Sequence, residues 1–172
     1  VSALTKLERI EVTSAQFQTV DLSNNLLLED VRFTGGEDEE GNQNQSELTE
    51  IIFGNNALIT YMELSSNKLS SLDLTFMDFE EYRYVDVSNN LLEELNIGKI
   101  SSMYLVDNPN LTCAKTTDVA YAEANYSSDP GLTFDPNCFS SENDILTFEI
   151  SGSVEVTFGA DQFISVTVLA GT

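Results

Sequence analysis

Three tyrosines and three carboxylates stand beside short aliphatic pairs at similar places along the chain. They are Tyr61, Tyr84, Tyr104, Asp21, Glu63 and Asp86. Tyrosine offers a wide apolar ring with a polar tip at low entropic cost, which suits contacts with proteins or sugars. Carboxylates pair with basic groups or hydroxyls. These six residues are therefore candidates for binding, provided that the fold presents them on one face.

The composition excludes several classes of chemistry. The 172 residues include 29 Asp and Glu, 7 Lys and Arg and no His, for a net charge of −22. Without histidine there is no Ser/His or Cys/His nucleophile pair and no imidazole metal ligand. With 29 acids, no two of them are marked out as a catalytic pair. We expect a protein that is not an enzyme.

The acidic charge also limits the partners. Nucleic-acid affinity comes largely from Lys and Arg that displace counterions, and anionic lipid headgroups attract the same residues. We therefore expect no nucleic-acid partner. No stretch of the chain approaches the roughly 18 apolar residues of a membrane span, so we expect no membrane insertion.

Internal repeats organise the chain. Four strings fit the pattern L-x-L-x-x-N-x-L: VDLSNNLL at 20–27, IIFGNNAL at 51–58, MELSSNKL at 62–69 and VDVSNNLL at 85–92. The two aliphatic residues point inward from a short strand, and the Asn side chain satisfies backbone groups that leave the strand. This position is occupied by Asn25, Asn56, Asn67, Asn90 and Asn108.

Weaker copies without the Asn lie between these strings. They are IEV at 10–12, VRF at 31–33, LDL at 72–74 and LNI at 95–97. The aliphatic pairs recur every 10 to 13 residues, which makes a full turn of about 21. Short strands at regular spacing also occur in β-sandwiches. However, a sandwich has no reason to repeat the same amide, whereas every coil of a solenoid has the same backbone groups to satisfy.

The run from Tyr61 to Cys113 resembles the 21-residue leucine-rich repeats of large secreted proteins from Bacteroidetes-type bacteria, in which an Asn-bearing strand alternates with an L-D-L strand. The segment NPNLTCAKTTDVAYAEANY, from Asn108 to Tyr126, resembles the closing cap of that family. The resemblance implies a right-handed leucine-rich-repeat solenoid of mostly short β-strands with little helix over residues 1–112, followed by a cap over 113–139. The acidic insert at 37–47 interrupts this array.

The cap has a physical account of its own, because a solenoid must cover the apolar face of its last coil. Asp118 is placed to N-cap a helix over residues 119–125, whose Val119, Ala120 and Ala124 could pack on that coil.

The two cysteines are Cys113 and Cys138, and they form no CxxC motif. A disulfide between them would close a 24-residue loop for roughly 3 kcal/mol. A single structural disulfide suits an oxidising compartment, so we expect a secreted or cell-surface protein. The alternative is two buried free thiols in a cytosolic protein.

Two further segments differ from the repeats. Residues 140–172 contain the alternating runs ILTFEI, VEVTF and FISVTVL, which resemble the start of an immunoglobulin-like module of a longer protein; alternatively they extend the cap. In the insert from Gly35 to Glu47, the acids of residues 37–40 could bind Ca²⁺ weakly. The insert lacks the spacing of a dedicated calcium loop, and such a charge run is usually solvated, so we expect no metal ion and no other cofactor.

Since leucine-rich repeats bind ligands through their strand face, the resemblance implies adhesion or recognition of a protein or glycan through the six candidate residues. Two points stay open. The acids could serve solubility alone, and spacing does not tell whether the strands at 20, 62, 85 and 103 or those at 10, 31, 51, 72 and 95 line one face. The alternative function is a structural spacer or accessory domain of a larger exoprotein, such as a polysaccharide-degrading enzyme, without a ligand of its own.

Overall fold

The computed structural model describes residues 4–37, 43–78 and 82–138. The chain divides into two units, Val1–Phe139 and Ser140–Thr172, and every described residue belongs to the first. The strands predicted within residues 140–172 and the acidic side chains of residues 37–40 lie outside the described part.

Most of the described elements are very short strands. In chain order they are β1 Arg9–Thr13, β2 Thr19–Asp21, β3 Asp30–Thr34, β4 Gly36–Glu37, β5 Gln43–Asn44, β6 Glu50–Ile52, β7 Tyr61–Glu63, β8 Ser71–Asp78, β9 Tyr84–Asp86, β10 Glu94–Lys99, β11 Ser102–Tyr104, β12 Cys113–Lys115, α1 Val119–Asn125, β13 Tyr126–Ser127 and β14 Thr133–Asp135. The helix has seven residues, and no helix in the described ranges is long and apolar enough to cross a membrane.

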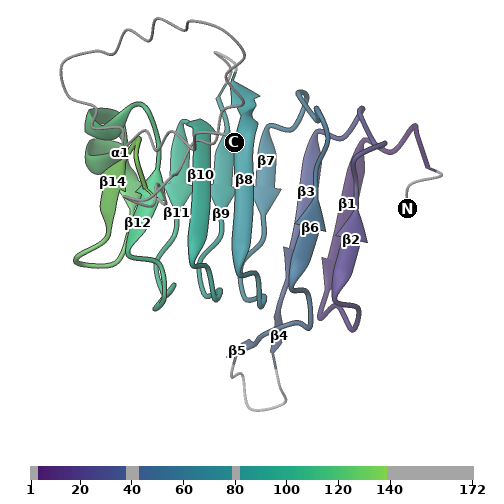
Figure 1. Cartoon of the computed structure of the whole chain (residues 1–172). Coiled ribbons are helices and arrows are strands. Elements are labelled where there is room, and N and C mark those ends of the chain that lie inside the picture. Colours follow the sequence, from purple (N-terminus) through teal and green to yellow (C-terminus); the bar gives the residue numbers. More distant parts are fainter. Residues whose placement is uncertain (1–3, 38–42, 79–81, 139–172) are drawn as a thin grey trace, which may run out of the picture. The chain divides into compact units, whose positions relative to one another are not determined.

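The strands form parallel sheets (Figure 1). A six-stranded sheet has the order β1-β3-β7-β9-β11-β13, a four-stranded sheet has the order β14-β12-β10-β8, and β2 pairs with β6. Apart from the antiparallel β4–β5 pair, successive strands alternate between the six-stranded sheet and the other two sheets. This architecture of short parallel strands with one helix in the described part is compatible with a strand-rich solenoid.

The core lies between the sheets and consists of the aliphatic pairs of the repeats. In β3, Val31 and Phe33 are fully buried, whereas the flanking Asp30, Arg32 and Thr34 are partly exposed. The strands β7, β9 and β11 also place a buried residue between more exposed ones, and β1 alternates between partly buried and exposed residues, because successive side chains of a strand point to opposite faces. The alternation explains why two aliphatic residues per unit suffice to build the core.

The repeated asparagines are buried and bond to backbone atoms, as predicted. The Asn67 amide donates to Phe33 O and Leu64 O, at 2.7 and 2.9 Å. The Asn90 amide donates to Leu64 O and Val87 O, at 2.8 and 3.0 Å. Asn67 and Asn90 therefore share Leu64 O as an acceptor, and Asn90 and Asn108 share Val87 O in the same way, which links these three repeats.

Neither of the two sets of strands considered from the sequence lines one face. The six-stranded sheet takes β1 and β3 from units without Asn, but β7, β9 and β11 from units with Asn. The change occurs because two Asn-bearing units, 51–58 and 62–69, follow each other directly. Strands keep alternating between sheets, so the kind of unit that supplies each sheet switches there. The insert between β3 and β6 leaves the alternation intact.

The segment after Leu111 contains the predicted helix and disulfide. The Asp118 carboxylate accepts a hydrogen bond from Tyr121 N at 3.3 Å, and Cys113 is bonded to Cys138. Val119 packs against the core, as predicted, but the two alanines do not. Ala122 is the buried residue, whereas Ala120 and Ala124 are exposed, because the helix turns a different face to the core.

Candidate functional site

The outward side chains of the six-stranded sheet form two rows that run across its strands. The first row is Arg9, Asp30, Tyr61, Tyr84 and Ser102. The second row is Glu11, Arg32, Glu63, Asp86 and Tyr104. Parallel pairing places the residues of each row side by side, because their strands run in register. Five of the six candidate residues thus lie on one face.

The three tyrosines form a continuous stack. The rings of Tyr61 and Tyr84 are 4.9 Å apart between centroids and 14° from parallel. The rings of Tyr84 and Tyr104 are 5.7 Å apart at 44°. Tyr61 and Tyr84 are half-buried by this packing, whereas Tyr104 is 41% exposed. The stack therefore reaches solvent most fully at Tyr104.

Arg32 occupies the other end of the stack. Its guanidinium carbon lies 4.2 Å from the centroid of the Tyr61 ring, within the range of a cation–π contact. The same group bonds both oxygens of Asp30, at 2.8 and 3.1 Å, and lies 3.8 Å from Glu63. Its hydrogen bonds to Asp30 raise the pKa of Arg32, so the group is always charged. One arginine is thus held by an aromatic face and two carboxylates.

Burial and neighbouring charge shift the titration of the tyrosines. Burial, with Asp86 as the next contribution, raises the pKa of Tyr84 from about 10 to about 12. Burial, followed by the charge of Glu63, also raises the pKa of Tyr61. The Tyr61 hydroxyl donates to Glu63 at 3.2 Å, which holds the ring and the carboxylate together. Both phenols are therefore neutral hydrogen-bonding groups at physiological pH.

Asp21 is the candidate residue that lies elsewhere. It is on β2, which pairs with β6 and belongs to a different sheet from Glu63 and Asp86. The Asp21 carboxylate caps the turn after its own strand by accepting hydrogen bonds from Ser23, and these hydrogen bonds lower the pKa of Asp21. The alignment of Asp21 with the other acids was wrong, because the unit that carries it supplies the opposite side of the core.

Arg32 and its partner Asp30 belong to this face, although the sequence analysis did not single them out; the same holds for Arg9, Glu11 and Ser102. The alternation in VRF already places Arg32 on an outward position. The sequence does not show that β3 lies beside β7. Paired residues of β3 and β7 are 31 positions apart, whereas those of β1 and β3 are 21 apart, which is the length of one turn of the repeat. The stacking of Arg32 on Tyr61 follows from that pairing.

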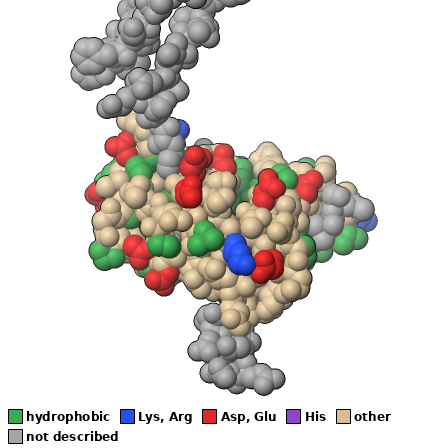
Figure 2. Space-filling model, turned by 60° about the horizontal axis from the view of Figure 1, so that its bottom comes forward, with side chains coloured by type: hydrophobic (Ala, Val, Ile, Leu, Met, Phe, Trp, Pro, Cys, Tyr) green, Lys and Arg blue, Asp and Glu red, His purple; other side chains and the backbone are tan. Residues whose placement is uncertain are grey.

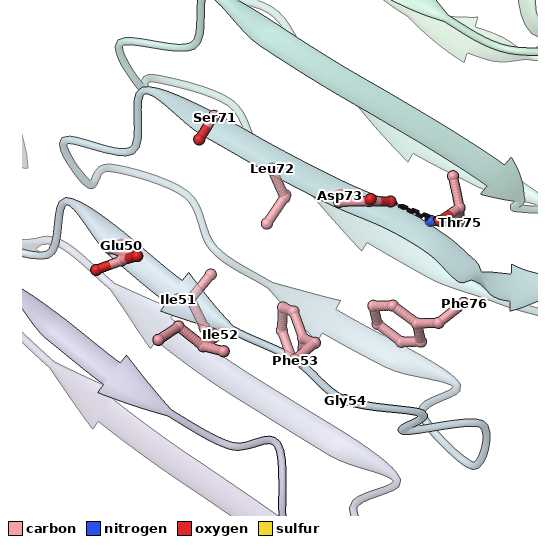
Figure 3. A pocket seen from close by; sticks show the side chains of 10 residues that line it. All are labelled: Glu50, Ile51, Ile52, Phe53, Gly54, Ser71, Leu72, Asp73, Thr75 and Phe76. Carbon is pink, nitrogen blue, oxygen red and sulfur yellow. Dashed lines mark hydrogen bonds between the residues drawn. The ribbon is translucent and has the colours of Figure 1, made fainter. Parts of the chain in front are cut away.

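A groove lies between β6 and β8, two strands that are not paired with each other. The groove holds about 370 Å³ and is lined by residues 50–54 and by residues of β8 (Figure 3). Phe53 and Phe76 meet there, with ring centroids 5.1 Å apart. Apolar side chains, together with Glu50 and Asp73, line the groove without an ordered aromatic row. The better candidate site is therefore the outer face of the six-stranded sheet with Tyr61, Tyr84 and Tyr104, which we call the tyrosine face.

Within residues 4–37, 43–78 and 82–138, no three Asp, Glu or Cys side chains are close enough to hold a metal ion. Acidic side chains outnumber Lys and Arg on the surface shown in Figure 2, in keeping with the net charge. The chemistry of the tyrosine face is accordingly that of stacking, hydrogen bonding and ion pairing.

Comparisons of the chain with protein-family models, curated proteins and solved structures found no significant match.

Proposed function

We propose that this chain is a leucine-rich-repeat module of a secreted or cell-surface protein, and that it recognises a protein or glycan through the outer face of its six-stranded sheet without catalysis. The observation that carries the proposal is the stack of Tyr61, Tyr84 and Tyr104 beside Glu63 and Asp86. Rigid aromatic groups lose little entropy on binding and are enriched among the residues that dominate interface energies.

Three further features support the proposal. The alternation of parallel strands and the shared carbonyls of the asparagines are what a right-handed repeat solenoid requires. The disulfide suits an oxidising compartment. The acids and arginines of the face alternate in sign near β1 and β3, as at interfaces that select their partner by charge.

Binding to a glycan array and to intact cells of candidate hosts tests the proposal. We expect the wild-type chain to bind at least one ligand, and the double variant Tyr84→Ser, Tyr104→Ala to lose that binding while its circular dichroism is unchanged. The matched control is the double variant Tyr82→Ala, Tyr121→Ala, because both tyrosines are exposed and lie outside the stack. If the chain binds nothing while a longer form of the protein binds a ligand, the module is a spacer and the proposal is wrong.

A further inference from the structure

We propose that the ligand of this face is an arginine-bearing segment of another protein, whose guanidinium group stacks on Tyr104 and pairs with Asp86. This inference rests on the proposed function, and it names the chemical class of the partner. Three features of the molecule support it: the arginine already bound on Tyr61, the exposed ring of Tyr104, and the negative charge of the chain.

Arg32 shows what the face binds. Its guanidinium lies on the ring of Tyr61, and its nitrogens contact the carboxylates of Asp30 and Glu63. An arginine side chain has a planar, weakly hydrated cation that stacks on aromatic rings and donates hydrogen bonds in its plane to carboxylates. The face thus contains one complete arginine site, occupied by a residue of its own chain.

The opposite end of the stack supplies one ring, Tyr104, and one carboxylate, Asp86, where the Arg32 site has one ring and two carboxylates. Tyr84 packs against Tyr104 on one side, at 5.7 Å. On the other side the neighbour in register is Ser127 of β13, whose small side chain leaves the Tyr104 ring accessible. Asp86 lies in register with Tyr104 on β9, and its carboxylate accepts a hydrogen bond from Ser88 N at 2.9 Å.

Charge distinguishes the two ends of the face. The β1 and β3 end carries Arg9 and Arg32, which form ion pairs with the acids around them. The strands β9, β11 and β13 read YVD, SMY and YS, and contain no Lys or Arg. A cationic segment is therefore attracted to the Tyr104 end. The net charge of −22 adds long-range steering that favours basic partners over acidic ones.

A titration followed by nuclear magnetic resonance tests the inference, with the peptide acetyl-Gly-Arg-Gly-amide as the probe and its lysine twin as the charge-matched control. We expect the largest shifts at the Tyr104 ring and at the amides of β9 and β11. We expect the arginine peptide to bind about fivefold more tightly than the lysine peptide, because arginine stacks in addition to carrying charge.

Two variants and two controls locate the site. Tyr104→Ala should weaken binding of the arginine peptide by about tenfold, and Asp86→Asn by about fivefold, as expected for a cation–π contact and an ion pair that are partly exposed to water. Tyr82→Ala removes an exposed tyrosine outside the stack, and Glu94→Gln removes an equal charge from β10 on another sheet. Both controls should bind as the wild type does.

Equal binding of the two peptides, or equal losses in Asp86→Asn and Glu94→Gln, would show that the chain attracts cations without a site and would overturn the inference. A glycan that requires Tyr104 while the arginine peptide shows no preference for the face would also overturn it, and would leave the proposed function standing. Self-association that depends on Tyr104 would make a second copy the occupant and refute the partner proposed here.

Discussion

Substituting Asn90 by Ala tests the account of how the repeats are linked. Asn90 is 1% exposed, and its amide donates to Leu64 O, Val87 O and Ser88 O. Its side-chain oxygen accepts from Leu69 N at 3.1 Å. Alanine removes all four hydrogen bonds but keeps the backbone conformation available, so the effect measures the side chain alone.

The cost follows from what each partner keeps. The three carbonyls retain a second donor, since Leu64 O still accepts from Asn67, Val87 O from Asn108 and Ser88 O from Ser66 N. The Leu69 N–H loses its acceptor inside the core. A buried donor left unsatisfied costs about 2 kcal/mol, and the three weakened carbonyls add about 1 kcal/mol together. We expect a loss of about 3 kcal/mol in the free energy of unfolding, a large part of the usual 5–15 kcal/mol.

Urea unfolding followed by tyrosine fluorescence measures this loss, since the chain has six Tyr and no Trp. The control is Asn55→Ala, which removes an exposed asparagine. Asn90→Asp separates the two functions of the side chain. It keeps the acceptor for Leu69 N–H but turns a carboxylate oxygen toward three carbonyls, and should also be destabilising at neutral pH. If Asn90→Ala loses no more stability than Asn55→Ala, the shared carbonyls do not hold the repeats together.

Three other predictions concern the tyrosine stack, the disulfide and a buried arginine. Burial raises the pKa of Tyr84 to about 12, so the stability that this residue contributes is present below pH about 10 and declines as the pH rises toward 12. Phenolate absorbance, and alkaline unfolding of the wild type compared with Tyr84→Phe, check this. Reducing the Cys113–Cys138 bond should lower the free energy of unfolding by about 3 kcal/mol, measured by urea midpoints with and without reductant, and an unchanged midpoint would contradict it. Arg83 is 1% exposed and its guanidinium donates to the Ile59 and Ala57 carbonyls, so Arg83→Met should cost about 3 kcal/mol by calorimetry and Arg83→Lys should recover part of that loss.

The sequence predicted local features well, because each is determined within a few residues. Alternation in a strand decides which side chains face out. The outward orientation of Tyr61 and Tyr84 beside buried apolar residues therefore follows directly from the sequence. The Asn positions were found in the same way. The amides of Asn67, Asn90 and Asn108 each bond the carbonyl three residues earlier in their own unit as well as one in the preceding repeat.

Features that depend on which strands pair could not be predicted. The assignment of Asp21 to the same column as Glu63 failed because two Asn-bearing units are adjacent at 51–69, and this moves later units of that kind to the other sheet. Arg32 was missed for the same reason, as its contact with Tyr61 crosses the longest spacing between paired strands of the six-stranded sheet. Strand pairing is settled by tertiary packing, and spacing alone does not specify it.

The direct succession of two Asn-bearing units also explains why the two ends of the tyrosine face carry different side chains. Before it, units without Asn bring arginines to the six-stranded sheet, and after it, Asn-bearing units bring tyrosines and acids. The contact between Arg32 and Tyr61 lies where the sheet changes from units without Asn to units with Asn. Gain or loss of one unit of about ten residues would therefore exchange the two surfaces in all the units that follow it while leaving the core pattern in place, so that a small change in length would alter the side chains that a face presents without a new fold.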